Sequence, residues 1–331
     1  MLSTEMNNVA CNGFGGPEVL HQSMSPVPTL GQGEVLIEVV AAGLNHADLL
    51  QRQGKYPPPP GASEILGMEV SGTIVAVDGD AKRWQIGDKV CALLTGGGYA
   101  RYVAVSARQC LPVPPGISVR DAAALPEAIV TIYANLFDAA GLKPNEIALI
   151  HGGASGIGTT AIQIIKALGG TVFVTVGSPE KAAACRHFGA DLAIDYKTED
   201  FVAAIRATTA GRGVDVVLDM VGGPYVNRNL DILAPFGRHI SIATQSGKMA
   251  EVDIRLLMQK RLVITGSTMR GRSEDEKARL LSEIEAKIWP LVTEGKIKPV
   301  IYQSFPLKNV VEAHKVMESG AHIGKIVLEV S

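Results

Sequence analysis

Apolar residues change their spacing along the chain near residue 121. Before that point, branched apolar residues form short runs bounded by Gly, Pro and Asp, which is typical of β-strands separated by turns. Strands are predicted at 35–41, 72–77, 89–94 and 99–105. The consecutive prolines at 57–60 remove backbone donors and predict a loop. The first part of the chain is therefore expected to be mostly β.

After Asp121, apolar runs of strand length alternate with longer segments of helical periodicity. This alternation is typical of a doubly wound parallel sheet, an α/β architecture. Six strands are predicted, at 147–150, 172–176, 192–195, 214–219, 239–242 and 262–266. The helix after the second strand has readable ends: Ser178 fits an N-cap, Pro179 the first helical position, and Gly189 the stop.

The last 60 or so residues contain two further helices and one isolated strand. One helix is predicted to start at Ser273, with Glu276 completing a capping box, and to bend near Pro290. A helix at 310–317 is followed by a strand at 325–330, which lacks neighbours in the second half. We expect this strand to return to the first domain. The predicted domains are 1–125 with 299–331, and 126–298.

A glycine-rich motif, HGGASGIG, occupies residues 151–158 between the first predicted parallel strand and its helix. Glycines let a backbone turn approach a pyrophosphate, and the helix N-terminus offers free N–H donors. The expected cofactor contacts here are Gly153, Ser155, Gly156, Ile157 and Gly158. The same motif also fits a tight turn that only packs helix on strand. Its place at the first of six βα units favours phosphate binding.

The choice of dinucleotide depends on residues near the end of the second strand. NAD-type sites place a carboxylate about 20 residues after the motif to accept the ribose hydroxyls. This chain instead has Gly177, Ser178 and, one helical turn later, Lys181, with Tyr196 just beyond the third strand. Lys181 alone also fits a solvated lysine, and Tyr196 a half-buried residue at a strand end. Together they favour a 2′-phosphate, and hence NADPH.

Composition and charge limit which partners and which cellular location are expected. The chain has 331 residues, 47% of them hydrophobic, which is enough for two cores, and a formal net charge of -2. That charge balance predicts neither a nucleic-acid surface nor a membrane-binding face. No secretory signal or membrane-spanning run is evident, and the four cysteines are scattered, which argues against a disulfide framework and a cysteine-rich zinc lobe. A cytoplasmic protein with reduced thiols is expected.

Several short stretches carry a resemblance that covers nearly the whole chain. They are GEVL at 33–36, LNHAD at 44–48, QRQGKY at 51–56, ILGMEVSG at 65–72, AALPEA at 123–128 and IGKIVL at 323–328. As a set, they make the chain similar to the zinc-free quinone oxidoreductase branch of the medium-chain dehydrogenase/reductase superfamily, which includes the zeta-crystallin and p53-inducible types.

The resemblance implies a GroES-like catalytic domain built from both chain ends, an inserted Rossmann domain with six parallel strands, and an active site in the cleft between them. It also implies a homodimer formed through the strand at 262–266. Zinc-dependent relatives place cysteine and histidine where this chain has Asn45 and Met68. An amide and a thioether cannot replace these ligands, so no metal is expected.

The resemblance also assigns functional residues. Asn45 and Tyr56 are expected at the nicotinamide and substrate end as catalytic residues, Asn45 donating from its amide to a carbonyl oxygen and Tyr56 from its hydroxyl. On sequence chemistry alone, Asn45 also fits a turn residue and Tyr56 a loop aromatic. The remaining expected cofactor contacts are Thr131, Gly237, Thr268, Met269, Arg270 and Lys325. Thr131 also fits a packing residue. Gly237 and the segment at 268–270 are expected after the fifth and sixth strands, where doubly wound sheets bind ligands.

The predicted activity is NADPH-dependent reduction of a quinone by direct, metal-independent hydride transfer. A small enone or alkenal is an alternative acceptor. A second alternative is a non-enzymatic protein that binds NADPH or RNA, because one fold serves several functions.

Overall fold

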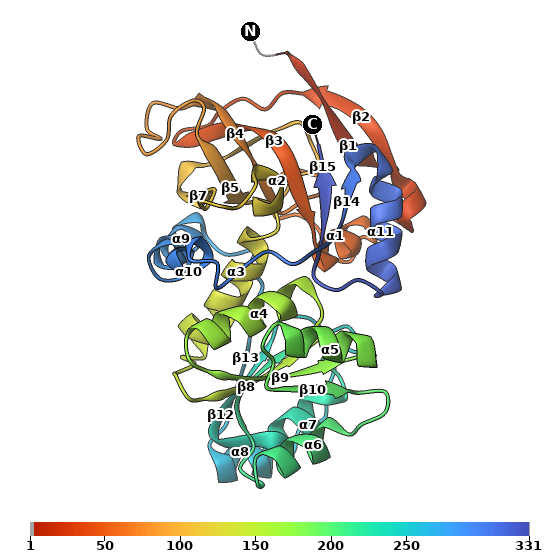
Figure 1. The fold of residues 1–331 in the computed structure, drawn as a ribbon. Helices are drawn as coiled ribbons and strands as arrows, with labels where there is room; N and C mark the ends of the chain where they lie inside the picture. Colours follow the sequence, from red (N-terminus) through yellow and green to blue (C-terminus); the bar gives the residue numbers. More distant parts are fainter. Residues whose placement is uncertain (1–2, 331) are drawn as a thin grey trace. The chain divides into compact units, whose positions relative to one another are not determined.

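The described residues, 3–330 in this computed structural model, form two compact units (Figure 1). Unit 1 consists of the described residues within Met1–Val130, Arg270–Gly295 and Pro299–Ser331. Unit 2 consists of Thr131–Met269 and Lys296–Lys298.

Unit 1 is built on a seven-stranded sheet that joins the two ends of the chain. Its strands are β3 (Glu34–Leu44), β4 (Glu69–Val77), β5 (Lys89–Leu93), β6 (Tyr102–Ser106), β7 (Cys110–Pro112), β14 (Ile301–Pro306) and β15 (Lys325–Glu329). Their order is β14-β15-β3-β4-β5-β7, with β6 paired to β3. β15 runs antiparallel to β3, with Ile326 opposite Leu44. The predicted return of the last strand is confirmed.

The predicted strands of unit 1 agree with the structure except at 99–105. β6 begins only at Tyr102, because the preceding residues pair elsewhere. The Tyr99 carbonyl accepts from the Val9 N–H, and Ala100 bridges Asn8. These partners belong to an antiparallel pair, β1 (Glu5–Cys11) and β2 (Leu20–Pro26). The prolines at 57–60 lie in a loop, as predicted.

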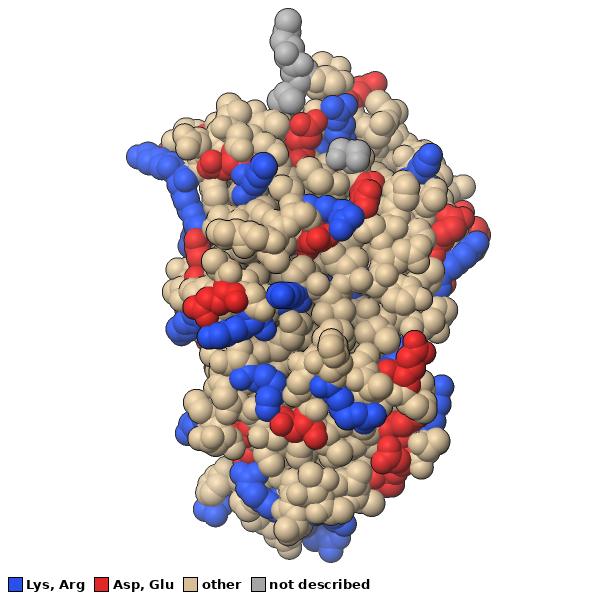
Figure 2. Space-filling view, in the orientation of Figure 1, with Lys and Arg blue, Asp and Glu red and all other residues tan. Residues whose placement is uncertain are grey.

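The helices of unit 1 are α1 (His46–Arg52), α2 (Val119–Ala122), α9 (Glu274–Lys287), α10 (Trp289–Thr293) and α11 (Val310–Ser319), and α3 (Pro126–Ile132) leads into unit 2. Among residues 3–330, no helix is both long enough and apolar enough to cross a membrane. On the face shown in Figure 2, acidic and basic side chains are interspersed.

The segment of α9 and α10 belongs to unit 1, whereas the boundaries inferred from the sequence grouped it with the Rossmann domain. Side-chain contacts explain the difference. Lys277 Nζ donates to Thr95 Oγ1 at 3.2 Å, and Trp289 Nε1 donates to the Pro112 carbonyl at 2.9 Å. The helix breaks between α9 and α10, just before Pro290, as predicted.

Only half of the capping box predicted at the start of α9 forms. The Ser273 hydroxyl accepts from the Glu276 N–H at 3.2 Å. The Glu276 carboxylate instead accepts from Arg272 at 2.7 Å, so a competing ion pair replaces the reciprocal bond.

Unit 2 contains the predicted six-stranded parallel sheet. Its strands are β8 (Ile147–His151), β9 (Thr171–Val176), β10 (Leu192–Asp195), β11 (Val214–Asp219), β12 (Leu233–Ser241) and β13 (Val263–Gly266). The order β10-β9-β8-β11-β12-β13 reverses direction beside β8, as in dinucleotide-binding folds. β12 starts earlier than predicted because a bulge separates Leu233 from Arg238 in its pairing with β11.

Helices cover both faces of this sheet. They are α4 (Gly156–Ala167), α5 (Pro179–His187), α6 (Phe201–Thr208), α7 (Tyr225–Ile232) and α8 (Ile254–Lys260). Figure 1 shows α4 and α5 on one face and α6, α7 and α8 on the other. Fully buried Leu149, Ile194, Ile205, Val217 and Leu230 belong to the core of this unit.

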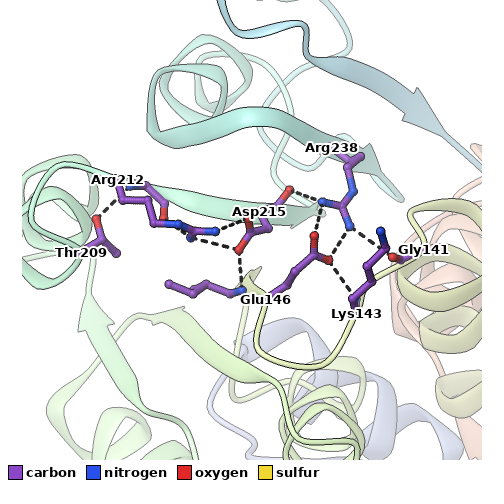
Figure 3. A network of polar contacts seen from close by, with 9 residues as sticks. Gly141, Lys143, Glu146, Thr209, Arg212, Asp215 and Arg238 are labelled. Carbon is purple, nitrogen blue, oxygen red and sulfur yellow. Dashed lines mark hydrogen bonds and ion pairs between the residues drawn. The ribbon is translucent and has the colours of Figure 1, made fainter.

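Ion pairs hold the amino-terminal edge of the unit 2 sheet (Figure 3). Arg238 on β12 donates two bonds to the Glu146 carboxylate, at 3.0 and 2.7 Å. Arg212 pairs in the same way with Asp215 on β11, at 3.1 and 2.6 Å. Asp215 also accepts from the Ile147 N–H at 2.8 Å, which ties β11 to the start of β8. This edge is therefore a structural element, at the end of the strands opposite to the glycine motif.

We expect Glu146→Gln to lower the free energy of unfolding at pH 7 by about 1 to 3 kcal/mol, because Arg238 loses its charged partner. Burial raises the pKa of Glu146, but hydrogen bonds from Arg238 and the Lys143 N–H outweigh it, so the pKa lies below 4.5. A carboxyl with a lowered pKa stabilises the fold above its unfolded pKa and loses that contribution as the pH falls through the folded value. The difference from wild type therefore shrinks below pH 4.5.

Denaturant titrations at several pH values measure this effect. Glu251→Gln is the matched control, since it neutralises an exposed carboxylate of the same unit. Equal destabilisation by both variants, or a difference that does not change with pH, would contradict the assignment.

Candidate active site

The glycine motif forms a tight turn between β8 and α4, at the carboxyl end of the central strand. A Cβ on Gly153 would lie 2.5 Å from the Val174 side chain, and one on Gly158 would lie 2.4 Å from the Gly152 carbonyl oxygen. Both positions therefore require glycine. The Ser155 hydroxyl caps α4 by accepting from the Gly158 N–H at 3.0 Å. The earlier N–H groups of this helix have no acceptor within the helix and are suited to an anion.

A second cluster gathers at the ends of β9 and β10. A Cβ on Gly177 would lie 2.7 Å from the Tyr196 hydroxyl, so these two predicted residues are neighbours. Ser178 caps α5, its hydroxyl accepting from the Lys181 N–H at 3.2 Å. Burial and the nearby Lys197 cation lower the pKa of Lys181. Two neighbouring ammonium groups give this cluster a positive charge that suits an anion.

The other predicted cofactor residues of unit 2 do not all lie together. Thr131, Thr268 and Met269 are near one another, whereas Gly237 lies elsewhere. Thr131 is buried, and its carbonyl accepts from Asn135 at 2.8 Å. Asn135 in turn accepts from Ser267 at 2.8 Å, so Thr131 is linked to the residue that precedes Thr268 and Met269. These positions lie at the carboxyl edge of the sheet, where doubly wound folds bind ligands.

Gly237 does not lie at that edge. It lies in the bulge of β12, where a Cβ would meet the Ala234 carbonyl oxygen and the Leu233 side chain, each at 2.8 Å. The glycine is explained by packing within the strand.

A buried polar network starts at His151, the first residue of the glycine motif. His151 binds Thr175 at 2.9 Å and Asn229 at 2.8 Å. Asn229 donates to Asp219 at 3.2 Å, and His239 contacts the same carboxylate oxygen at 3.1 Å. Burial lowers the pKa of His151, which keeps the ring neutral. The network joins β8, β9, β11, β12 and α7, and so gives the motif a rigid base.

Unit 1 brings Asn45 and Lys325 together with a residue that the sequence did not single out, Glu69. The Lys325 ammonium donates to Asn45 Oδ1 at 2.6 Å and also to Glu69 Oε1. Asn45 Nδ2 donates to Glu69 Oε1 at 2.9 Å and makes a longer contact, 3.4 Å, with the Gly43 carbonyl. Lys325 was expected at the cofactor, but its ammonium is bound to these two side chains.

Asp48, another unpredicted residue, holds the start of α1. Its carboxylate accepts from the Asn45 N–H at 2.8 Å, the Gly67 N–H at 3.1 Å and the Tyr99 hydroxyl at 3.1 Å. Burial raises its pKa to about 6, although these bonds and Lys325 oppose the shift. Asp48 therefore fixes the backbone from which the Asn45 side chain extends.

Tyr56 and Arg270 are also neighbours. The Arg270 guanidinium carbon lies 5.5 Å from the centre of the Tyr56 ring, and its Nη1 donates to the Tyr56 carbonyl at 3.3 Å. Burial and the Glu127 carboxylate raise the pKa of Tyr56, while Arg270 lowers it. The hydroxyl is therefore neutral and can donate. Arg270, expected at the cofactor, supports the Tyr56 loop in unit 1.

The side chains around Asn45 do not suit a divalent metal. Within residues 3–330, no group of three or more His, Cys, Asp and Glu residues is placed to hold an ion. An ammonium already occupies the acceptor side of the Asn45 amide, and its charge would repel a second cation. The residues of unit 2, by contrast, fit a phosphorylated dinucleotide: glycines without room for a Cβ, a helix N-terminus and paired lysines.

Sequence reasoning missed Glu69, Asp48 and Lys197 for different reasons. Glu69 and Asp48 lay within recognised motifs, and only the structure shows what their carboxylates bind. Lys197 directly follows Tyr196, so its position beside the predicted phosphate site was a usable signal.

Two family models match the chain. One, described as an alcohol dehydrogenase GroES-like domain, covers residues 31–115, and the other, described as a zinc-binding dehydrogenase, covers residues 188–328. The second description names zinc, although unit 1 has an ammonium at Asn45.

The similar proteins include quinone oxidoreductases and VAT-1 homologs. Quinone oxidoreductase 1 of Escherichia coli is 33% identical over 318 residues, covering 95% of this chain and 96% of the relative. A synaptic vesicle membrane protein VAT-1 homolog of Danio rerio is also 33% identical, over 96% of this chain and 68% of the relative.

Solved structures give the same grouping. Escherichia coli quinone oxidoreductase complexed with NADPH aligns with a TM-score of 0.88 at 32% identity, over 98% of this chain and all of that chain. The CurK enoyl reductase aligns with a TM-score of 0.87 at 27% identity, over 99% and 100% of the two chains. The chain therefore belongs to the quinone oxidoreductase branch of the medium-chain dehydrogenase/reductase superfamily.

Proposed function

We propose that this oxidoreductase uses NADPH to reduce a quinone without a metal. The observation that carries the proposal is the Lys325 ammonium on the Asn45 amide, because a site with a fixed organic cation there cannot rely on Lewis-acid activation. The acceptor must then be electrophilic enough to take hydride directly. Quinones meet this requirement, and the similarity to quinone oxidoreductases supports the choice.

Unit 2 supplies the residues that bind the cofactor. The backbone from Gly153 to Gly158 and the N-terminus of α4 receive the pyrophosphate. Lys181 and Lys197, with Tyr196 beside Gly177, receive the 2′-phosphate. When bound, NADPH supplies the hydride from its nicotinamide C4.

Unit 1 supplies the polar contacts to the acceptor. The Asn45 amide donates a hydrogen bond from Nδ2 to the acceptor oxygen, where negative charge develops. The Tyr56 hydroxyl remains protonated because its pKa is raised by burial, so it is a donor throughout the physiological pH range. Asp48 and Arg270 hold the two backbones in place.

An enone or alkenal reductase is the second candidate. The CurK enoyl reductase has a similar structure, and a neutral tyrosine hydroxyl can also protonate carbon after hydride arrives. A non-enzymatic protein that binds NADPH or RNA is the third candidate, and turnover would exclude it. The interspersed charges in Figure 2 offer no support for RNA binding on that face.

We also propose a homodimer formed along β13, the edge strand of the unit 2 sheet. Val263 and Ile264 are 50% and 41% exposed, and Ile254 and Met258 on α8 are 59% and 73% exposed. An exposed apolar edge strand needs a covering partner, and a second copy of this chain offers the same edge. The unpaired cysteines suit a reducing, cytoplasmic location.

Rapid oxidation of NADPH is expected when a benzoquinone or naphthoquinone is added, with no loss of rate under a metal chelator. The product distinguishes the candidates, since a quinone gives a hydroquinone and an enone gives a saturated ketone. Failure with every quinone, despite tight NADPH binding, would count against the proposed function.

Lys181→Glu is expected to raise the Michaelis constant for NADPH by about ten- to a hundredfold, because a charged hydrogen bond of about 1.5 to 3 kcal/mol is lost. The constant for NADH changes much less, since NADH lacks the 2′-phosphate. Lys143→Glu, at the opposite edge of the sheet, makes the same charge change and serves as control. Equal effects of Lys181→Glu on both cofactors refute the phosphate assignment.

The double variant Val263→Lys/Ile264→Lys is expected to dissociate the dimer, because lysines on an edge strand oppose pairing. Analytical ultracentrifugation should give twice the 34.9 kDa chain mass for wild type and the single mass for the variant. Lys248→Met, at an exposed position of the same unit, is the control. A monomeric wild type, or a variant that remains dimeric, removes this proposal.

A further inference from the structure

Lys325 and Glu69 contact opposite ends of the Asn45 amide. We propose that this pair positions Asn45, so that one defined N–H is presented to the acceptor oxygen. The inference rests on the proposed function for its catalytic consequence, but its structural part can be tested without turnover. Lys325 and Glu69 are positioning residues, since they act through Asn45.

The sheet order explains how the three side chains meet. β15 and β4 lie on either side of β3, and Asn45 directly follows the last residue of β3. Ile326 of β15 pairs with Leu44, so Lys325 lies one step beyond, beside Asn45. On the other side Val70 pairs with Ala42, which brings Glu69 to the end of β3. The backbone pairing therefore delivers a cation and an anion to the two sides of one amide.

The chemistry of the pair permits only one orientation of the amide. An ammonium can donate but not accept, so it must face Oδ1, at 2.6 Å. A carboxylate can only accept, so it must face Nδ2, at 2.9 Å. Turning the amide over would bring its oxygen against the carboxylate and its N–H groups against the ammonium. Asn45 is thus fixed by charge as well as by packing.

One amide hydrogen remains weakly engaged. Glu69 takes one of the two Nδ2 hydrogens, and the other has only the 3.4 Å contact with the Gly43 carbonyl. That distance is longer than an ordinary N–H···O bond, so an acceptor oxygen can compete for this hydrogen. An ammonium on the amide oxygen also polarises the group, which strengthens the remaining N–H as a donor.

Glu69 is itself held firmly. Its second oxygen accepts from the Glu127 N–H, at the start of α3, at 2.9 Å. A Cβ on Gly43 would lie 2.1 Å from Glu69 Oε1, so glycine at this position leaves the space that the carboxylate fills. The side chains of Lys325 and Glu69 are 5% and 0% exposed, and neither charge is screened by water. Such a pair is costly to form and is kept in place by its additional hydrogen bonds.

Two variants test the proposal, and a third serves as their control. Lys325→Met/Glu69→Gln removes both charges together, which avoids leaving one buried charge without its partner. Gly43→Ala displaces the Glu69 carboxylate while leaving every charge intact, and its Cβ would also lie 2.8 Å from the Ala123 carbonyl oxygen. Lys166→Met is the matched control, because it makes the same change in a lysine whose ion pair, with Asp191, is partly exposed and lies in unit 2.

The first measurement needs no turnover. Hydrogen exchange of the Asn45 side-chain NH₂ is followed by NMR in full-length protein labelled with ¹⁵N-asparagine, and the signal is identified by its loss in Asn45→Leu. We expect exchange to be at least about tenfold faster in the double variant and in Gly43→Ala than in wild type or Lys166→Met, because a displaced side chain loses its protection. Unchanged exchange in both test variants overturns the proposal.

The second measurement separates positioning from cofactor binding. In the double variant, kcat for quinone reduction is expected to fall about ten- to a hundredfold through misplacement of the donor, with the NADPH dissociation constant within about twofold of wild type. Loss of NADPH affinity with retained kcat would instead make Lys325 a cofactor ligand and overturn the inference. If wild type reduces no quinone but the exchange result holds, the proposed function fails while the positioning of Asn45 stands.

Discussion

The contact between Lys325 and Glu69 joins residues 256 positions apart and fixes the architecture of unit 1. The last strand must return beside β3 for the ammonium to reach its partners, so the two ends of the chain form one sheet. A buried charge without a partner is strongly unfavourable, which makes the pair a constraint on register as well as a contact. Shifting β15 by one residue would turn Lys325 away from Asn45 and leave the buried Glu69 carboxylate without its cation.

Unit 2 has a different electrostatic task from unit 1, because it is proposed to bind the phosphates of the cofactor. Its proposed phosphate contacts are backbone N–H groups at the start of α4 and two lysines near Tyr196, all at the carboxyl edge of the sheet. Beneath them, neutral His151 bonds to Thr175 and Asn229, and Asn229 links it to the buried Asp219 carboxylate. The ion pairs of Arg238 and Arg212 lie at the other edge, where they stabilise strands without competing for an anion.

Local sequence patterns predict much of the fold of unit 2. The periodicity of apolar runs predicts the six parallel strands, and the HGGASGIG motif predicts the turn, because both depend on neighbouring residues. The roles of Lys325 and Arg270 could not be predicted in this way. Each depends on partners far away in the chain, Asn45 and Tyr56, and on sheet order. The place of α9 in unit 1 likewise follows from side-chain contacts such as that of Lys277 with Thr95.

The contacts of two buried cations, Lys325 and Arg270, limit the reactions that the proposed enzyme can catalyse. Lys325 is bound to Asn45 and Glu69, and the Arg270 guanidinium is packed over Tyr56, so neither cation is directed at an acceptor by the contacts described. Stabilisation of a developing oxyanion then depends on neutral donors, the Asn45 amide and the Tyr56 hydroxyl, each worth a few kcal/mol, about 3 to 4 at most. A simple ketone concentrates the incoming charge on one oxygen, and so depends more on such donors. A quinone spreads the incoming charge over a conjugated ring, and so requires less from the protein.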